Sequence, residues 1–353
     1  HKEFMSDIQT QFVKNVLADA ASAPKPAGSA FAPSNIALAK YWGKRAAALN
    51  LPINSSLSIS LGALGTRTEI RERGSVEATS SSLDRGSDVP VAPDDVYLNG
   101  VLQAPETSFA RRVSSFLDLF RPLFAGRGFE VRTENNIPTA AGLASSASGF
   151  AALVMALDDL AGWGLDKKRL SMLARLGSGS AARSVYDGFV QWNAGENPDG
   201  TDSFAERLDA VWPDFRVGVL ELSAAEKPVG SRDGMNRTVE TSALYESWPA
   251  QARRDIETIR TAIENRDFSA LGAAAENNAL AMHATMMSAW PPLIYLQPES
   301  IEMIHQVQRV RSEGLEVYLT IDAGPNLKLL FLAENEAAVA AAFPELQLIK
   351  PFG

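Results

Sequence analysis

The sequence predicts a mixed α+β fold with two lobes, and three observations support this prediction. The chain has 353 residues, which exceeds the size at which a single hydrophobic core usually stops growing. Segments with alternating apolar residues, typical of strands, are interspersed with segments of helical spacing. An apolar content of 46% with 21% charged residues is ordinary for a globular protein, which excludes disordered, collagen-like and coiled-coil classes.

In the first lobe, helical spacing at residues 5–17 precedes a Pro-rich stretch, and the first strand begins near Ser29. A polar insertion is expected at residues 80–95. The remaining elements of this lobe are recognised by their periodicity. They are strands at 57–73, 96–98 and 128–134, and helices at 109–124, 142–160 and 165–176. The helix at 142–160 is apolar on nearly every side, which indicates a buried helix.

The second lobe is predicted to begin near residue 210, after the polar region at 192–202. Its elements follow the same two periodicities. They are strands at 217–222, 316–321 and 327–332, and helices at 252–265, 268–286 and 298–312. Residues 1–4 precede Met5 and are interpreted as an expression scar. The predicted lobes are therefore 5–210 and 211–353.

Charge and composition narrow the function classes. The net charge of −9 leaves no basic footprint for nucleic acid or for an anionic membrane. The absence of cysteine excludes a disulfide framework and thiolate metal sites. The longest apolar stretch, at 147–157, is too short to cross a bilayer. We expect a cytoplasmic protein with a small-molecule ligand.

Two catalytic classes lack sequence support. His283 and His305 lie far apart in the chain, and no clustered carboxylates accompany them, so they do not indicate a metal site. A Ser-His-Asp triad is not supported by a Gly-x-Ser-x-Gly motif.

Residues 138–147 form a loop of small residues that opens directly into the buried helix. Backbone N–H groups and the positive helix end converge there with the hydroxyls of Ser145 and Ser146. Gly142 and Ala144 allow a phosphate to approach the main chain closely. The pattern predicts a phosphate cradle, although a tight turn with serine capping has the same composition. It is neither a Walker loop nor a dinucleotide fingerprint.

Residues 32–45 concentrate cationic and aromatic side chains around one predicted turn. Lys40, Lys44 and Arg45 accompany Tyr41 and Trp42 in an otherwise acidic protein. This segment is either a second anion site or a packed turn whose lysine stems cover aromatic rings.

Residues 177–184 form a third small, hydroxyl-rich turn, which carries Arg183. A guanidinium grips a carboxylate or phosphate through two parallel hydrogen bonds, so Arg183 could orient an acidic substrate. The alternative is a surface ion pair. Lys227, with Ser231 and Arg232, is a weaker candidate phosphate contact.

Asp322 ends an alternating strand and precedes Ala323, Gly324 and Pro325. A carboxylate at a strand end is a common position for a catalytic acid. An aspartate before such a turn could instead hydrogen-bond only its own backbone.

Taken together, these segments resemble the GHMP kinase superfamily and, within it, the diphosphomevalonate decarboxylase family. The resemblance extends from Ala32 to Pro351. It implies a first lobe like the second domain of ribosomal protein S5 and a ferredoxin-like α/β sandwich as the second, with the active site in the cleft between them. Its motifs are residues 35–44, 54–56, 138–146, 177–183, Ser231-Arg232 with Met235, 282–285 and 322–326.

The resemblance also implies a reaction. The family uses ATP and Mg²⁺ to phosphorylate the 3-hydroxyl of mevalonate 5-diphosphate, after which phosphate and CO₂ leave and isopentenyl diphosphate remains. Asp322 and Lys40 match its catalytic pair, while Arg183 and Asn35 match the groups that hold the substrate carboxylate. Further matching positions lie around the substrate or the nucleotide. They are Tyr41, Lys44, Ser178, Ser180, Ser231 and Arg232 for the substrate, and Ser145, Ser146, Gly142 and Ala144 for ATP and Mg²⁺.

Three alternatives stay open at this stage. The same residues could act on mevalonate 5-phosphate, or a kinase of the superfamily could stop at the phosphorylated product. A ligand-binding relative without turnover is the third alternative, and the retained Asp322 and serine-rich cradle argue against it. A homodimer is expected by analogy with relatives.

Overall fold

The computed structural model describes residues 2–73, 93–137, 145–223 and 227–353, with the backbone alone for residues 2–6 and 145. The chain divides into two compact units. The first unit consists of His1–Ala32, Gly65–Asn136 and Ser145–Val185. The second unit consists of Pro33–Leu64, Ile137–Ala144 and Tyr186–Gly353. The lobe boundary near residue 210 stays a prediction.

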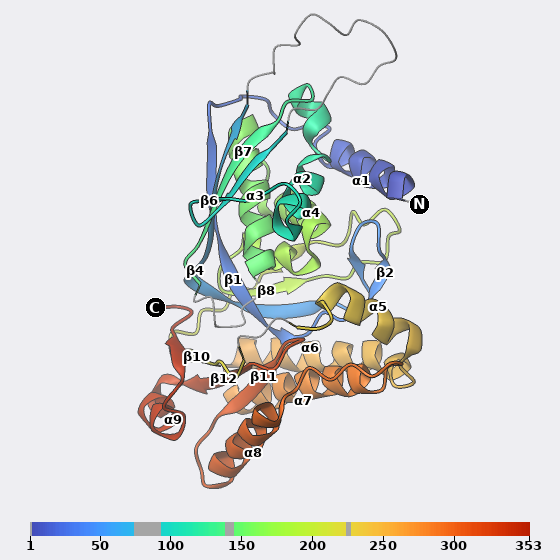
Figure 1. The fold of residues 1–353 in the computed structure, drawn as a ribbon. Coiled ribbons are helices and arrows are strands. Elements are labelled where there is room, and N and C mark those ends of the chain that lie inside the picture. The colour runs from blue at the N-terminus through green and yellow to red at the C-terminus, as the bar shows by residue number, and fades with distance from the viewer. Residues whose placement is uncertain (1, 74–92, 138–144, 224–226) are drawn as a thin grey trace, which may run out of the picture. The chain divides into compact units, whose positions relative to one another are not determined.

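The first unit combines strands with a buried helix (Figure 1). Strand β7 (Phe129–Asn135) pairs antiparallel with the second part of β4 (Ser56–Glu72) and parallel with β5 (Asp95–Leu98). Helices α3 (Ser145–Ala161) and α4 (Lys167–Gly177) pack against each other. The remaining elements are α1 (Lys2–Val16), β6 (Val101–Leu102), α2 (Ser108–Leu117) and the 3₁₀ helices η1 (Arg121–Phe124) and η2 (Gly179–Val185).

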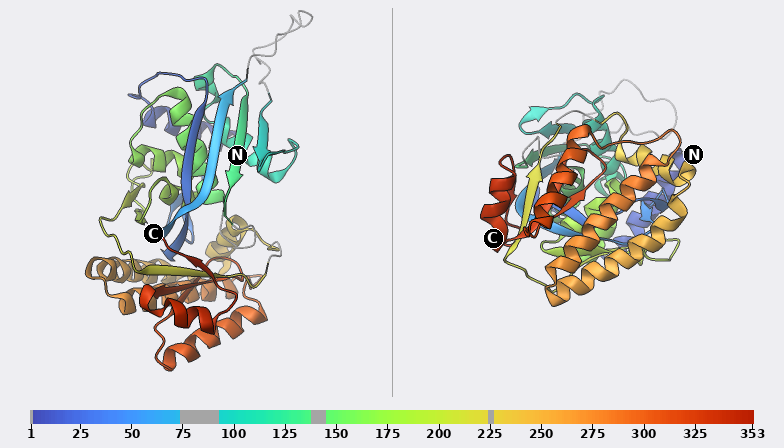
Figure 2. Two further views of the ribbon diagram at one scale, coloured as in Figure 1. Left: turned by 90° about the vertical axis from the view of Figure 1, so that its left-hand side faces the viewer. Right: turned by 90° about the horizontal axis from the view of Figure 1, so that it is seen from below.

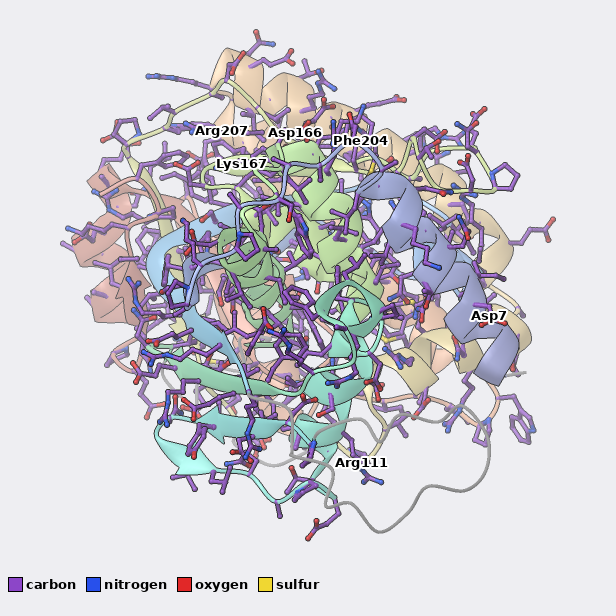
Figure 3. The ribbon with its side chains drawn as sticks, turned by 90° about the horizontal axis from the view of Figure 1, so that it is seen from above. Asp7, Arg111, Asp166, Lys167, Phe204 and Arg207 are labelled. Atoms are coloured by element: carbon purple, nitrogen blue, oxygen red, sulfur yellow. The ribbon has the colours of Figure 1, made fainter. Side chains whose placement is uncertain are left out.

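The start of α4 shows how local sequence sets a helix boundary. The Asp166 side chain accepts a hydrogen bond from the Arg169 N–H at 2.8 Å. This N-cap satisfies a donor that the helix itself leaves unpaired. Asp166 and Lys167 mark this helix start in Figure 3.

The second unit contains a four-stranded antiparallel sheet in the order β11-β12-β10-β13. These strands are Tyr318–Ile321, Leu327–Leu332, Phe215–Leu220 and Gln347–Ile349. The antiparallel helices α6 (Trp248–Asn265) and α7 (Phe268–Met287) run side by side (Figure 2). Leu330 packs in one core with these two helices. Leu329 packs in another core with α8 (Pro298–Ser312) and α9 (Glu336–Ala342).

Other short elements complete the second unit. β1 (Gly28–Ala39) enters it, and the first part of β4 pairs with β8 (Phe189–Trp192). The rest are β2 (Lys44–Ala46), β3 (Leu51–Pro52), β9 (Ala205–Arg207), η3 (Tyr245–Ser247), η4 (Ala333–Asn335) and α5 (Ser231–Thr241). In the described part of the chain, no helix combines the length and apolarity that crossing a bilayer requires.

The mixed α+β class is confirmed, and most long elements lie within a few residues of their predicted bounds. The predicted helix at 109–124 is wrong in its second half: α2 ends at Leu117, and the 3₁₀ turn η1 contains Pro122. Proline lacks an N–H and disfavours the helical conformation of its preceding residue. α1 begins at Lys2, so its backbone includes residues interpreted as an expression scar.

Two predicted turns contain regular secondary structure. The segment 32–45 is not one turn, because residues up to Ala39 belong to strand β1 and β2 begins at Lys44. Similarly, residues 177–184 are largely the 3₁₀ helix η2. Most of the predicted insertion at 80–95 lies outside the described residues.

Candidate active site

Lys40 and Asp322 meet in the second unit although 282 positions separate them in the sequence. The Lys40 Nζ donates to Asp322 Oδ1 at 2.7 Å. The Lys40 side chain is only 2% exposed, whereas the Asp322 side chain is 40% exposed. The alternative reading of Lys40 as a stem covering aromatic rings is therefore wrong, because its ammonium forms a buried ion pair. Asp322 keeps one side accessible to a ligand.

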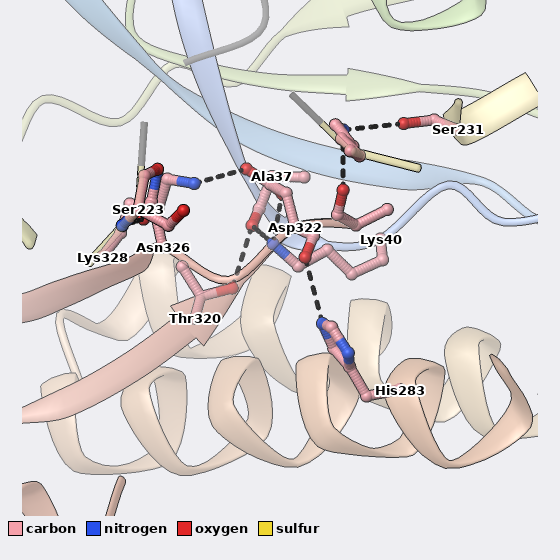
Figure 4. A network of polar contacts seen from close by, with 11 residues as sticks. Ala37, Lys40, Ser223, Ser231, His283, Thr320, Asp322, Asn326 and Lys328 are labelled. Carbon is pink, nitrogen blue, oxygen red and sulfur yellow. Dashed lines mark hydrogen bonds and ion pairs between the residues drawn. The ribbon is translucent and has the colours of Figure 1, made fainter. Parts of the chain in front are cut away.

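A second lysine reaches the same carboxylate. Lys328 of β12 places its Nζ 3.1 Å from Asp322 Oδ2, and its side chain is 2% exposed. Figure 4 shows this network. The interpretation of Asp322 as a residue that bonds only its own turn is thus wrong. We call Asp322 with Lys40 and Lys328 the carboxylate centre.

The two lysines determine the ionisation of Asp322. Burial by itself raises the pKa of the carboxyl, but the charges of Lys40 and Lys328 outweigh burial, so the pKa lies well below its ordinary value. Asp322 is consequently a carboxylate throughout the physiological range. A carboxylate accepts hydrogen bonds from a substrate hydroxyl without first losing a proton.

His283 of α7 holds the backbone of Asp322. Its Nε2 lies 3.0 Å from the Asp322 carbonyl oxygen. Burial lowers the pKa of His283 to about 4, so the ring is neutral near pH 7. A carbonyl oxygen only accepts, and Nε2 must therefore carry the hydrogen. His283 acts here as a structural donor next to the carboxylate.

The backbone of Lys40 is held equally firmly. Its N–H donates to Asn278 Oδ1 at 2.7 Å, and its carbonyl accepts from Asn54 Nδ2 at 2.8 Å. Asn278 in turn donates from Nδ2 to Asp255 Oδ2 at 2.9 Å. Both Asn278 and His283 belong to α7. One helix thus positions both partners of the Lys40–Asp322 pair.

The turn after Lys40 is held by two hydrogen bonds and by close packing at Gly43. The Trp42 carbonyl accepts from Tyr245 Oη at 2.8 Å and from Trp248 Nε1 at 3.0 Å. Gly43 has φ +114°, and a Cβ there would lie 1.7 Å from Tyr245 Oη. Only glycine fits this position. Tyr41 packs edge-on against Trp192, with ring centroids 4.9 Å apart.

A second group of cations, the cation cluster, consists of Lys44, Lys227 and Arg232 with Ser231. Lys227 Nζ donates to Ser231 Oγ at 3.1 Å and to the Ala323 carbonyl at 2.6 Å. Burial, followed by the charge of Arg232, lowers the pKa of Lys44 to about 8. A lysine whose charge is disfavoured by a neighbouring cation suits an anionic ligand.

Helix α5 adds to this cluster because it begins at Ser231. Its N-cap, Gly230, supplies no side-chain hydrogen bond to the first turn. Uncapped N–H groups and the positive end of the helix favour an anion. The predicted substrate residues Lys44, Ser231 and Arg232 are thereby brought together.

The other predicted site residues lie in separate places. Arg183, in η2 of the first unit, is 3% exposed, so the surface-ion-pair alternative is wrong. In the same unit, Ser178 Oγ and Ser180 Oγ lie 3.3 Å apart. Asn35 lies half-buried in β1 within the second unit. Gly142 and Ala144 fall outside the described residues, and Ser145 begins α3.

A cavity in the first unit opens beside the start of α3. It lies against α2, β7 and α3, and its walls are mainly apolar with a few polar groups. The lining residues are Phe109, Arg112, Val113, Thr133, Asn135, Ser146, Gly149, Phe150 and Leu153. Ser146 is the predicted member of this set. Apart from Ser146, these residues form no contiguous motif, so sequence reasoning missed them.

Family models cover almost all of this architecture. Residues 32–205 match the diphosphomevalonate decarboxylase-like N-terminal domain, and residues 217–349 match the mevalonate 5-diphosphate decarboxylase C-terminal domain. The chain belongs to the diphosphomevalonate decarboxylase family. The resemblance seen in the sequence is confirmed.

Individual family members agree with this assignment. The diphosphomevalonate decarboxylase of Aspergillus fumigatus is 39% identical over 326 residues, covering 88% of this chain and 78% of the relative. The Bos taurus diphosphomevalonate decarboxylase is 39% identical over 337 residues, which cover 89% of this chain and 80% of the relative.

Solved structures of the family share the fold. Mevalonate diphosphate decarboxylase from Enterococcus faecalis superposes with a TM-score of 0.81 at 39% identity, covering 91% of this chain and 95% of that chain. The structure of the Staphylococcus aureus enzyme gives a TM-score of 0.82 at 34% identity, and the match covers 92% of this chain and 95% of that chain. The predicted GHMP kinase fold is therefore confirmed.

Proposed function

We propose that the protein converts mevalonate 5-diphosphate and ATP to isopentenyl diphosphate, ADP, phosphate and CO₂. The carboxylate centre carries this proposal, because an ionised aspartate beside a buried lysine suits the activation of a substrate hydroxyl. One structure of the family supports this set of ligands, and it is described as MDDEF in complex with MVAPP, AMPPCP and magnesium. It is 40% identical to this chain, with a TM-score of 0.81, and the match covers 91% of this chain and 95% of that chain.

In the first step, the 3-hydroxyl oxygen attacks the γ-phosphorus of ATP, a new O–P bond forms and ADP leaves. Asp322 accepts the hydrogen bond of the hydroxyl, aims its oxygen and takes up its proton as the O–P bond forms. Lys40 offsets negative charge beside the transferring group. Phosphoryl transfer passes through a loose transition state, so orientation and charge neutralisation carry most of the catalysis.

In the second step, the C3–O bond breaks and phosphate leaves with the bonding pair. The C1–C2 bond then breaks, its electrons form the C2=C3 double bond, and C1 departs as CO₂. Arg183 and Asn35 hold the carboxylate so that the breaking bond stays aligned. A guanidinium fork is well suited to a carboxylate. The removal of Arg183 from solvent strengthens that contact.

The far end of the substrate binds the cation cluster. Lys44, Ser231 and Arg232 contact its diphosphate, with the N-terminus of α5 behind them. Tyr41, Ser178 and Ser180 complete the substrate contacts. Lys44, Lys227 and Arg232 gather three cations around Ser231, which favours two phosphates over one and ranks the diphosphate above the monophosphate.

The nucleotide binds the first unit. The cavity beside α3 offers apolar walls to a base, with Asn135 and Thr133 as polar groups. Ser145 and Ser146, with Gly142 and Ala144, hold the phosphates. Within the described residues no three His, Cys, Asp or Glu side chains group as a metal site. Mg²⁺ that is bound mainly by phosphates and water fits such a donor set, with serine hydroxyls as protein ligands, and it neutralises phosphate charge.

One assay tests the proposal against its alternatives. ADP and CO₂ are measured with mevalonate, its 5-phosphate and its 5-diphosphate in parallel. We expect equal amounts of ADP and CO₂ from the diphosphate, with kcat/KM at least about tenfold above that for the monophosphate. ADP without CO₂ would instead identify a kinase, and faster CO₂ release from the monophosphate would identify a phosphomevalonate decarboxylase.

We further propose a cytoplasmic homodimer with lobes at 5–210 and 211–353, supported by the family resemblance. Light scattering coupled to gel filtration tests the dimer, which predicts twice the 37.9 kDa mass of the chain.

A further inference from the structure

Lys328 occupies an unusual position for a lysine. Strand β12 reads Leu-Lys-Leu-Leu-Phe-Leu, and all its neighbours in the strand are apolar. Alternation places Lys328 on the same face as Leu330, which packs against α6 and α7. A buried ammonium is costly unless an anion compensates it. The Lys328 Nζ lies 3.1 Å from Asp322 Oδ2.

The surroundings direct Lys328 toward the substrate side of the sheet. Thr320 of β11 lies directly opposite Lys328 in the strand register. The Thr320 hydroxyl donates to the Ala37 carbonyl at 3.3 Å, and Lys40 Nζ donates to the same oxygen at 2.8 Å. Lys328 therefore belongs to the polar group around Lys40, whereas Leu327 and Leu329 belong to the core on the other face.

The two lysines hold different oxygens of Asp322. Lys40 binds Oδ1 and Lys328 binds Oδ2, while His283 holds the backbone carbonyl. A single ion pair leaves a carboxylate free to rotate about its Cβ–Cγ bond. A second contact on the other oxygen removes this freedom. Each oxygen has two lone pairs, so a held carboxylate can still accept from a hydroxyl.

We infer that Lys328 is a positioning residue for the proposed reaction: it fixes the orientation in which the Asp322 carboxylate meets the substrate hydroxyl. This inference rests on the proposed function. It assigns Lys328 no contact with substrate or nucleotide, which separates it from Lys40. Alignment of a reactive group to within a fraction of an ångström is what such a contact provides.

Lys328 should also affect the pKa of Asp322, which can be measured separately from kcat. Among the residues that the structure describes, the charged or titratable groups that face Asp322 are Lys40, Lys328, Lys227 and His283, and His283 is neutral near pH 7. Removing the charge of Lys328 takes away one of the two lysines that lower the pKa of Asp322. The pKa of the carboxyl should then rise, and the carboxylate should be lost at a higher pH than in the wild type.

The test compares Lys328→Met with wild type over a range of acidic pH values. Methionine has a similar length and no charge. We expect kcat for CO₂ release to fall about ten- to a hundredfold, with KM for both substrates changed by less than about threefold. The acid limb of the kcat profile should move to higher pH, a shift that a merely structural defect would not cause. Lys350→Met is the matched control, because Lys350 pairs with Glu336 at the surface.

Several outcomes would overturn the inference. One is that Lys328→Met keeps the wild-type kcat and the wild-type acid limb. Another is that this variant shows a large rise in KM at unchanged kcat, which would make Lys328 a binding group. If the methionine variant does not fold, Lys328→Arg decides: it should keep the wild-type acid limb but lose kcat, because a guanidinium displaces the carboxylate. Wild-type kcat in that variant would contradict positioning. A wild type that releases no CO₂ would reject the proposed function instead.

Discussion

The carboxylate centre and the cation cluster use the same side-chain chemistry in opposite ways. At the carboxylate centre, Lys40 and Lys328 are buried and share the charge of Asp322. In the cation cluster, Lys227 and Arg232 are exposed, and the Lys44 ammonium donates to the neutral amide oxygen of Asn50. The first arrangement is complete without a ligand. In the second arrangement, Lys44 and Arg232 gain a counter-charge when an anion binds.

The scaffolds differ accordingly. Around the carboxylate centre, Asn278 and His283 of one helix fix two backbones by hydrogen bonds. The cation cluster instead rests on the first residue of β2, a loop and the first residues of α5. Rigid packing suits a group that must aim a reacting atom, and a less compensated surface suits a group that binds charge. Substitutions in the first region should therefore lower kcat, whereas those in the second should raise KM.

The largest effect is expected from Asp322→Asn. The amide keeps the shape but cannot hold two lysines by charge, so kcat should fall by about 10³-fold or more. Binding of ATP should remain nearly intact, as measured by calorimetry. Glu336→Gln is the control, because Glu336 also contacts two cations, Arg216 and Lys350. Substantial turnover by Asp322→Asn would remove the carboxylate centre from the mechanism.

Much of the fold could be predicted because long elements carry a clear period. The helix predicted at 268–286 corresponds to α7, Phe268–Met287. Short elements are too brief to show a period, and β2, β3, β6, β8, β9, α9 and β13 are absent from the predictions for that reason. α5 is absent because its sequence is mostly polar and its N-cap is glycine, which gives little helix-start signal.

Some residues of the candidate site could be predicted from the sequence, and others could not. The family resemblance identified Asp322 and Lys40, although nothing local connects residues 282 positions apart. Sequence reasoning missed Lys328, because the strand around it is apolar and was interpreted only as core. A single lysine inside that apolar strand was the one signal that could have pointed to it. For His283, sequence reasoning found no support for a metal ligand or a triad member and placed the residue in the family motif 282–285 without a role. Its hydrogen bond to a backbone carbonyl depends on tertiary packing, which the sequence does not display.

A smaller effect is expected in the cation cluster. Arg232→Met should raise KM for the diphosphate substrate about ten- to a hundredfold, because a charge-assisted hydrogen bond contributes about 1.5–3 kcal/mol. Its kcat should change much less. Arg237→Met is the control on the same helix, since its guanidinium donates a long hydrogen bond, 3.5 Å, to the Pro291 carbonyl. An equal loss in kcat would erase the distinction between the two regions.

The smallest effect concerns the protonation of Lys44. Its pKa of about 8 in the free protein should rise when the diphosphate binds, because an anion favours the charged ammonium. Binding near pH 8 should therefore take up protons, and affinity should fall as pH rises above about 8, by up to about tenfold per pH unit.

Calorimetry of mevalonate 5-diphosphate binding, in buffers with different ionisation heats, measures this proton uptake. Lys44→Arg provides the comparison, because a guanidinium stays charged across this range and should bind without taking up a proton at this position. Proton uptake that persists unchanged in Lys44→Arg would assign the titration to another group. Its loss would show that the cation cluster, unlike the carboxylate centre, reaches its full charge only when the ligand arrives.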